Sequence, residues 1–252
     1  MAELDRNRMT RTGTVPRADA PVIDEGLRAY MIRVYNYMAA GVAITGVVAY
    51  LTYNFAVVDT GAGLQLTEFG NLIYNTAFKW VVILAPLGMV FFLSARLGSM
   101  SLGGAQIAFW IFAGLMGLSL SSIFLAYAGE SIARVFFITA AAFGSLSLWG
   151  YTTKKDLSGW GSFLFMGLIG VIIAMLVNLF LGSTALQFAI SVIGVLVFAG
   201  LTAYDTQQIK EMYYVGDDGT VAGRKAIGGA LRLYLDFINM FIMLLSLFGN
   251  RN

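Results

Sequence analysis

The sequence predicts an all-α integral membrane protein, a bundle of seven transmembrane helices. Of its 252 residues, 58% are hydrophobic and 12% are charged, whereas a soluble globular chain carries about 25% charged residues. The mean hydropathy is +0.76, and apolar segments close to the roughly 20 residues that cross a bilayer recur along the chain. Water cannot be the main solvent of such a chain. Seven spans leave too little sequence for a separate soluble domain, so residues 27–252 are expected to form one membrane domain.

Residues 1–26 are predicted to be a disordered cytoplasmic tail. This stretch is polar, contains Pro16 and Pro21, and lacks the apolar residues that would order it. It also lacks the short apolar core and small-residue cleavage site of a signal peptide. We therefore expect the first hydrophobic segment to remain as a true span.

Apolar runs bounded by glycine, proline or charge give the positions of the seven spans. They are expected at 35–57, 79–96, 104–128, 133–151, 160–181, 186–207 and 227–248. Very short connections join the fourth, fifth and sixth spans, so these helices should be antiparallel neighbours. The Gly-rich connection EMYYVGDDGTVAGRKAIGG before the seventh span is expected to be a flexible cytoplasmic loop.

The distribution of basic residues predicts the orientation. Cytoplasmic segments attract Lys and Arg, and twelve of the sixteen basic residues fall on the side of the N-terminus. They are Arg6, Arg8, Arg11, Arg17, Arg28, Arg33, Arg96, Lys154, Lys155, Lys210, Arg224 and Lys225. The N-terminus is therefore predicted to be cytoplasmic, and the odd number of spans places the C-terminus on the opposite face.

Composition excludes several classes of function. The chain has no cysteine and no histidine, which excludes disulfides, thiolate or imidazole metal sites and every triad that needs a histidine base. The net charge of +2 and the scattered basic residues do not predict a nucleic-acid partner. No glycine-rich phosphate loop is present, and neither a cofactor nor an enzymatic activity is predicted. The lipid bilayer is the expected partner, and proton chemistry must depend on carboxylates.

Two aspartates lie within predicted spans. Asp205 lies in AYDTQQIK near the cytoplasmic end of the sixth span, and Asp236 lies in LYLDFIN about two turns into the seventh. A carboxylate at membrane depth costs at least about 2.5 kcal/mol. Because the two spans are consecutive and antiparallel, both aspartates should lie at a similar depth, where they can touch.

A pair of touching carboxyl groups in a low-dielectric site cannot ionise twice at low cost, so the pair would share one proton. We expect such a pair to sense pH and, when ionised, to offer oxygen ligands to calcium. Arg96, at the end of the second span, and Arg232, one turn before Asp236, are expected to stabilise the ionised form.

Each of these residues also has a purely structural interpretation. Asp205 can be an ordinary interfacial residue beside Lys210. Asp236 can be neutralised by an ion pair with Arg232. Both arginines can be anchors that extend to the membrane surface.

The segments KKDLSGWGSFLFMGLIG, AYDTQQIK and LYLDFINMFIMLLSLFG resemble the transmembrane Bax inhibitor motif family, in its bacterial YccA-like branch. The resemblance runs from LRAYMIRVYNYMAAG to the C-terminus. It implies seven helices with the last one central, pH-dependent permeation of calcium and a bacterial inner membrane. By motif position it also implies a gating site of Asp205, Asp236 and Arg96. A glutamate in the second span and an arginine near the end of the seventh, present in some members, are missing here.

The sequence thus favours a pH-sensitive calcium leak channel gated by the paired aspartates. One alternative is a non-catalytic regulator of a membrane protease or another membrane complex, bound through the tail. A second is an intramembrane aspartyl protease, although LYLDFIN lacks the GxGD pattern of those enzymes.

Overall fold

The computed structural model describes residues 19–61 and 63–251. Within them, seven helices are long and apolar enough to cross a membrane, which confirms the predicted bundle. The long helices are α1 (Asp19–Ala56), α3 (Lys79–Arg96), α4 (Leu102–Leu120), α6 (Gly129–Thr152), α7 (Ser158–Leu181), α8 (Thr184–Glu211) and α9 (Gly219–Phe248). The third span is completed by the short helix α5 (Ile123–Ala126).

Two predicted boundaries differ from the structure. Helix α1 begins at Asp19, inside the segment expected to be a disordered tail, and residues 1–18 of that tail lie outside the described part of the chain. Helix α9 begins at Gly219 rather than at 227, so most of the predicted flexible loop before it is helical. The Asp218 carboxylate accepts hydrogen bonds from the N–H groups of Thr220 and Val221, and this cap fixes the early start of α9.

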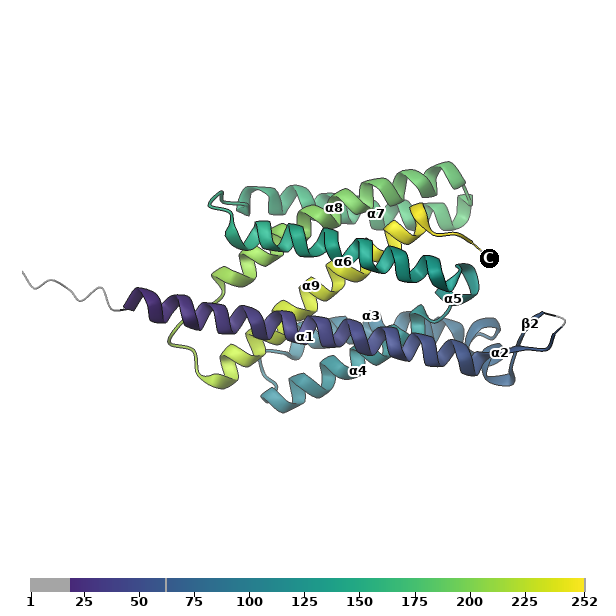
Figure 1. The fold of residues 1–252 in the computed structure, drawn as a ribbon, viewed down its shortest axis with the longest axis horizontal. Coiled ribbons are helices and arrows are strands. Elements are labelled where there is room, and N and C mark those ends of the chain that lie inside the picture. The colour runs from purple at the N-terminus through teal and green to yellow at the C-terminus, as the bar shows by residue number, and fades with distance from the viewer. Residues whose placement is uncertain (1–18, 62, 252) are drawn as a thin grey trace, which may run out of the picture.

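The connection between the first two spans contains elements that the hydropathy pattern does not show. Strands β1 (Val57–Asp59) and β2 (Leu64–Leu66) pair in an antiparallel hairpin, and the short helix α2 (Glu68–Asn75) follows. A Cβ added at Gly70 would lie 2.0 Å from the carbonyl oxygen of Ala56, so α2 packs directly on the end of α1. The hairpin and α2 together cover the face where α1 ends (Figure 1).

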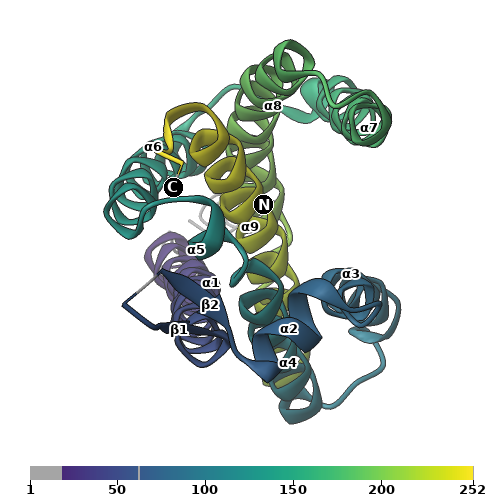
Figure 2. The ribbon, with the colours of Figure 1, turned by 90° about the vertical axis from the view of Figure 1, so that its right-hand side faces the viewer.

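Helix α9 occupies the centre of the bundle and crosses it obliquely (Figures 1 and 2). We call α1, α3 and α4 the α1 group, and α6, α7 and α8 the α6 group. One buried apolar cluster joins α9 to the α1 group, and a second joins it to the α6 group. Most of the α9 residues are buried, whereas outward side chains of the other helices are exposed apolar groups, such as Phe180 at 88%. The protein is therefore apolar on the surface that faces lipid as well as in its core.

The two groups are separated where α1 faces α6. Helix α1 packs on α4 and α9, and α6 packs on α8 and α9. Between α1 and α6 lie two cavities of about 580 and 300 Å³. A chain of hydroxyl groups crosses this space, with Tyr35 2.7 Å from Ser147 and Ser147 2.8 Å from Thr206 of α8. Apart from that chain and from Phe143 of α6 and Ile209 of α8, which join the buried cluster of the α1 group, the groups meet mainly through α9.

Candidate functional site

Asp205 and Asp236 lie on neighbouring helices in the core of the bundle. Helix α8 runs toward the face where α1 begins, which we call the N-terminal face, and α9 runs away from it (Figure 1). The two helices pack along each other, and the carboxyl groups lie close enough for the charge of Asp205 to act on Asp236. Asp236 is 4% exposed and Asp205 is partly buried. The structure thus places close together the two aspartates that were expected to touch from their positions in consecutive spans.

The surroundings of Asp236 do not satisfy its carboxyl group. Its Oδ2 atom is buried and has no hydrogen-bond partner among the described residues. Its chain neighbours include the buried apolar side chains of Leu233 and Phe237. A buried carboxylate without partners is costly, and a proton shared with Asp205 lowers that cost because only one negative charge remains. The pair is therefore suited to hold a proton.

Arg232 is the basic residue whose charge acts on the aspartate pair. Its positive charge acts on both carboxyl groups, yet within residues 19–61 and 63–251 the one ion pair joins Lys225 to Asp217. The structure therefore does not contain the Asp236–Arg232 ion pair that would make Asp236 purely structural. Arg232 is exposed. Its charge therefore acts on the pair at a distance and not through an ion pair.

Arg96 does not reach the pair. It ends α3 and is exposed, and it is not among the charged groups that act on either aspartate. Leu97, the next residue, packs toward α9 instead: a Cβ added at Gly228 would lie 2.9 Å from its Cδ2 atom. Since successive helical residues are about 100° apart around the axis, Arg96 points elsewhere when Leu97 faces α9. Arg232, rather than Arg96, is therefore the arginine whose charge acts on the two aspartates.

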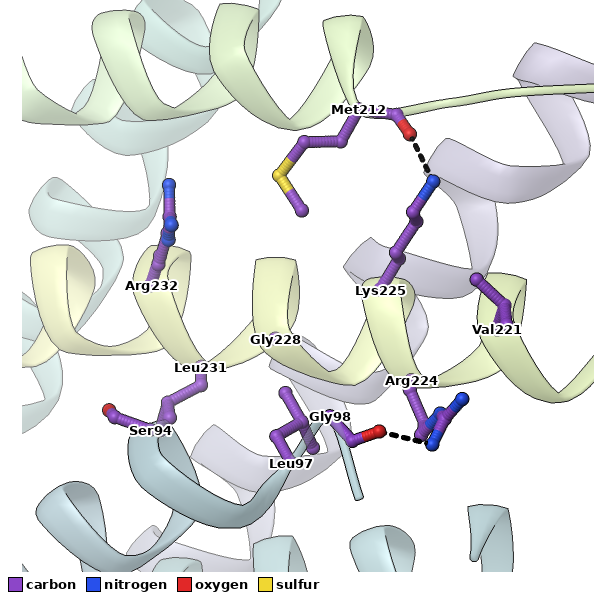
Figure 3. Close-up of a pocket in the computed structure, with 10 residues that line it drawn as sticks. All are labelled: Ser94, Leu97, Gly98, Met212, Val221, Arg224, Lys225, Gly228, Leu231 and Arg232. Atoms are coloured by element: carbon purple, nitrogen blue, oxygen red, sulfur yellow. Dashed lines mark hydrogen bonds between the residues drawn. The ribbon is translucent and has the colours of Figure 1, made fainter. Parts of the chain in front are cut away.

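A cavity of about 450 Å³ lies beside Arg232 on the N-terminal side, between the ends of α3 and α8 and the first half of α9. Figure 3 shows Lys225 and Arg232 directed to one side of α9 and Arg224 directed toward Gly98. Arg224 donates to the carbonyl oxygens of Gly98 and Met100. Lys225 donates to the carbonyl oxygen of Met212 and pairs with Asp217. Arg224 thus holds the α3–α4 connection against α9, and Lys225 holds the α8–α9 connection. Arg232 makes no such bond with the described residues and lines the cavity.

Sequence reasoning did not select Arg224 or Lys225 as structural residues of this region. The sequence feature that could have indicated their role is their position in the Gly-rich, charged connection before the seventh span. Lysine and arginine in such a loop can donate to the free carbonyl groups at helix ends. The contacts to Gly98, Met100 and Met212 are of this kind.

The pair alone is an incomplete calcium site. The described residues contain no group of three or more acidic, histidine or cysteine side chains that could hold a metal ion. Calcium takes about 6–8 oxygen ligands, and two carboxylates supply four oxygen atoms at most. Any calcium at the pair would need water or backbone oxygens as well.

Comparison with known proteins gives matches along nearly the whole membrane domain. The family model described as inhibitor of apoptosis-promoting Bax1 matches residues 27–252. The inner membrane protein YbhL of Escherichia coli (strain K12) is 47% identical, over 94% of this chain and 98% of its own. Protein RP147 of Rickettsia prowazekii (strain Madrid E) is 49% identical, over 90% and 92%. A protein of Caulobacter vibrioides is 48% identical over 92% of both chains. The names of these relatives designate no catalytic activity.

Proposed function

The chain belongs to the Bax inhibitor-1 family, and on this premise we propose that it is a pH-sensitive leak pathway for cations, including calcium, gated by Asp205 and Asp236. The observation that supports this proposal is the placement of the two carboxyl groups, one of them buried, on packed adjacent membrane helices, where the charge of Asp205 acts on Asp236. A similarity to YbhL supports placement in a bacterial inner membrane. The excess of basic residues on the N-terminal face supports a cytoplasmic N-terminus.

A shared proton would hold the gate closed. With one proton between them, Asp205 and Asp236 attract each other and keep α8 against α9. Loss of that proton leaves two negative charges, which at a separation of ~4 Å and an effective dielectric constant of ~20 repel by about 4 kcal/mol. That energy shifts an equilibrium between two helix arrangements about a thousandfold. Rising pH would therefore open the pathway, and Arg232 would moderate the repulsion.

The described conformation corresponds to the closed state in this proposal. The cavity beside Arg232 lies on the N-terminal side, and neither aspartate lines it. Toward the opposite face, α8 and α9 are packed through buried apolar side chains, including Phe198, Leu201 and Met240. Opening requires that this contact loosen, and the ionised carboxylates would then offer oxygen ligands to a passing cation.

Calcium flux in proteoliposomes tests the proposal. The unmodified protein is compared with Asp205→Asn and Asp236→Asn over about pH 5 to 8, a range that includes carboxyl pairs with strongly displaced titration. Asp59→Asn is the matched control, because Asp59 lies exposed in the β1–β2 hairpin on the opposite face. We expect flux that rises with pH, loses its pH dependence in either pair variant and is unchanged in the control. Absence of flux at every pH, or unchanged pH dependence in both pair variants, would refute the proposal.

A further inference from the structure

The larger cavity between α1 and α6 is a groove in the N-terminal half of the membrane domain. Its volume is about 580 Å³, with one wall from Arg28 to Ala39 of α1 and the other from Phe143 to Tyr151 of α6. Ile32 and Leu148 on these walls are 47% and 63% exposed, so the groove opens sideways toward lipid. It results from the fold, because α1 and α6 pack on α9 rather than on each other.

The length of the groove matches one leaflet of a bilayer. From Arg28 to Ala39, α1 rises about 16 Å at ~1.5 Å per residue. Half of the hydrocarbon core of a bilayer is about 15 Å. A groove that runs along the membrane normal and is one leaflet deep has the dimensions of a single acyl chain.

The interior of the groove is apolar in effect. Met31, Met38 and Phe143 contribute to its walls. Two of the three hydroxyl-bearing residues that line the groove, Tyr35 and Ser147, hydrogen-bond to each other at 2.7 Å, and the third, Tyr151, lies at the N-terminal end. Because the Tyr35 and Ser147 hydroxyl groups already have hydrogen-bond partners, an acyl chain can lie against them without leaving either one unpaired.

The end of the groove at the N-terminal face carries positive charge. Arg28 is exposed there and forms no hydrogen bond or ion pair with another residue of the described part of the chain. Lys210 donates to the carbonyl oxygen of Tyr151 at 2.9 Å and lies 5.3 Å from the centre of its ring, which places a second cation at the same end. Arginine and lysine near the membrane surface bind lipid phosphates.

From the depth of the groove, its apolar walls and the two cations at its mouth, we propose that it binds one anionic phospholipid. One acyl chain lies between α1 and α6, and the phosphate lies at Arg28 and Lys210. Such a lipid fills the space between the α1 group and the α6 group on the N-terminal side. This site is separate from the aspartate pair and does not depend on ion permeation.

Gly144 allows the groove to be filled without disturbing the helix packing. It lies on the α6 wall, and a Cβ added there would meet no atom within 4 Å. The substitution Gly144→Leu therefore places a side chain in the path of the acyl chain. Gly170→Leu is the matched control, since Gly170 is an exposed glycine of α7 whose added Cβ also meets no atom within 4 Å. For the phosphate end, Arg28→Gln is compared with Arg33→Gln, an exposed arginine of α1 outside this groove.

Native mass spectrometry of the full chain in detergent, titrated with phosphatidylglycerol or phosphatidylcholine, measures the binding. We expect one phosphatidylglycerol per chain, bound more tightly than phosphatidylcholine. Arg28→Gln should weaken it about tenfold, the effect of one lost charge-assisted hydrogen bond. Gly144→Leu should weaken it at least as much, because the leucine side chain occupies the path of the acyl chain. Both controls should bind as the unmodified protein does. Equal binding of the two lipids, or undiminished binding by Gly144→Leu in a folded protein, would overturn the proposal. Thermal unfolding of each variant establishes that it is folded.

Discussion

Replacement of Thr45 should destabilise the protein more than replacement of its partner Tyr234. The Thr45 hydroxyl on α1 lies 2.9 Å from the carbonyl oxygens of Gly41 and Ala113 and 2.6 Å from the Tyr234 hydroxyl of α9. Thr45 has one proton and can donate it to a carbonyl group, so Tyr234 is the donor in their shared bond. Both side chains are buried, with Tyr234 at 0% exposure, and their bond joins α1 to α9 next to α4.

The two truncations leave different groups behind. Tyr234→Phe removes the donor while Thr45 keeps its carbonyl acceptor, so the loss is that of one hydrogen bond between membrane helices, about 0.6 kcal/mol and at most about 1.7. Thr45→Val keeps the shape but leaves the Tyr234 hydroxyl buried without a partner, which costs about 1–3 kcal/mol. The double variant should be more stable than Thr45→Val alone, because the unpartnered hydroxyl is gone.

Reversible unfolding in mixed micelles, followed by circular dichroism, measures the free energies for this cycle. Tyr30→Phe is the matched control, since the Tyr30 hydroxyl is already buried without a hydrogen-bond partner among the described residues. Its removal should leave stability unchanged or increase it. If Tyr234→Phe cost as much as Thr45→Val, or if Tyr30→Phe were the more damaging tyrosine variant, the assignment of donor and acceptor would be wrong.

Three further outcomes are expected. Gly150→Ala should lower the free energy of unfolding by about 1–3 kcal/mol, because the added Cβ would lie 2.3 Å from the carbonyl oxygen of Ala203 on α8; a thermal melt with no shift would contradict this close approach. Burial raises the pKa of Tyr74, outside the membrane spans, above its ordinary value of 10.0, so the protonated form is favoured in the folded state. The stability that this provides is present below about pH 10 and is lost as the pH rises further, and Tyr74→Phe should flatten that part of a stability profile; an unchanged profile would exclude this contribution. Arg232→Gln should move the pH midpoint of calcium flux upward, since a charge that favours the ionised pair is lost, whereas Arg96→Gln should leave the midpoint unchanged; the reverse pattern would restore Arg96 to the site.

The fold class and the approximate position of each span could be predicted because hydropathy depends on composition over about 20 residues. The second predicted span, 79–96, coincides with α3. The same averaging misses features set by single side chains. The Asp218 cap begins α9 within a Gly-rich segment, and the close contact of Gly70 with Ala56 folds α2 onto α1.

The aspartates could be selected because a carboxylate in an apolar helix is rare and costly, and because consecutive spans must be antiparallel. The arginines could not be sorted in this way. A charge at a helix end is common, and the resemblance placed Arg96 in the site with Arg232 only as a modulator. The direction of each side chain in the structure favours Arg232 instead. That direction depends on the rotation of α3 about its own axis, which packing of Leu97 near Gly228 fixes and which the sequence pattern does not contain.

The central position of α9 has a mechanical consequence. Both groups of helices pack on it, while cavities separate α1 from α6. Relative motion of the two groups would therefore be a shear of two blocks along a common helix, which small shifts of packed side chains can accommodate without bending any span. Asp236 and Arg232 belong to that common helix, and Asp205 belongs to one of the blocks. The distance between the carboxyl groups would then change with the displacement of one block relative to the other, and in the proposed gating a change in their protonation would drive that displacement.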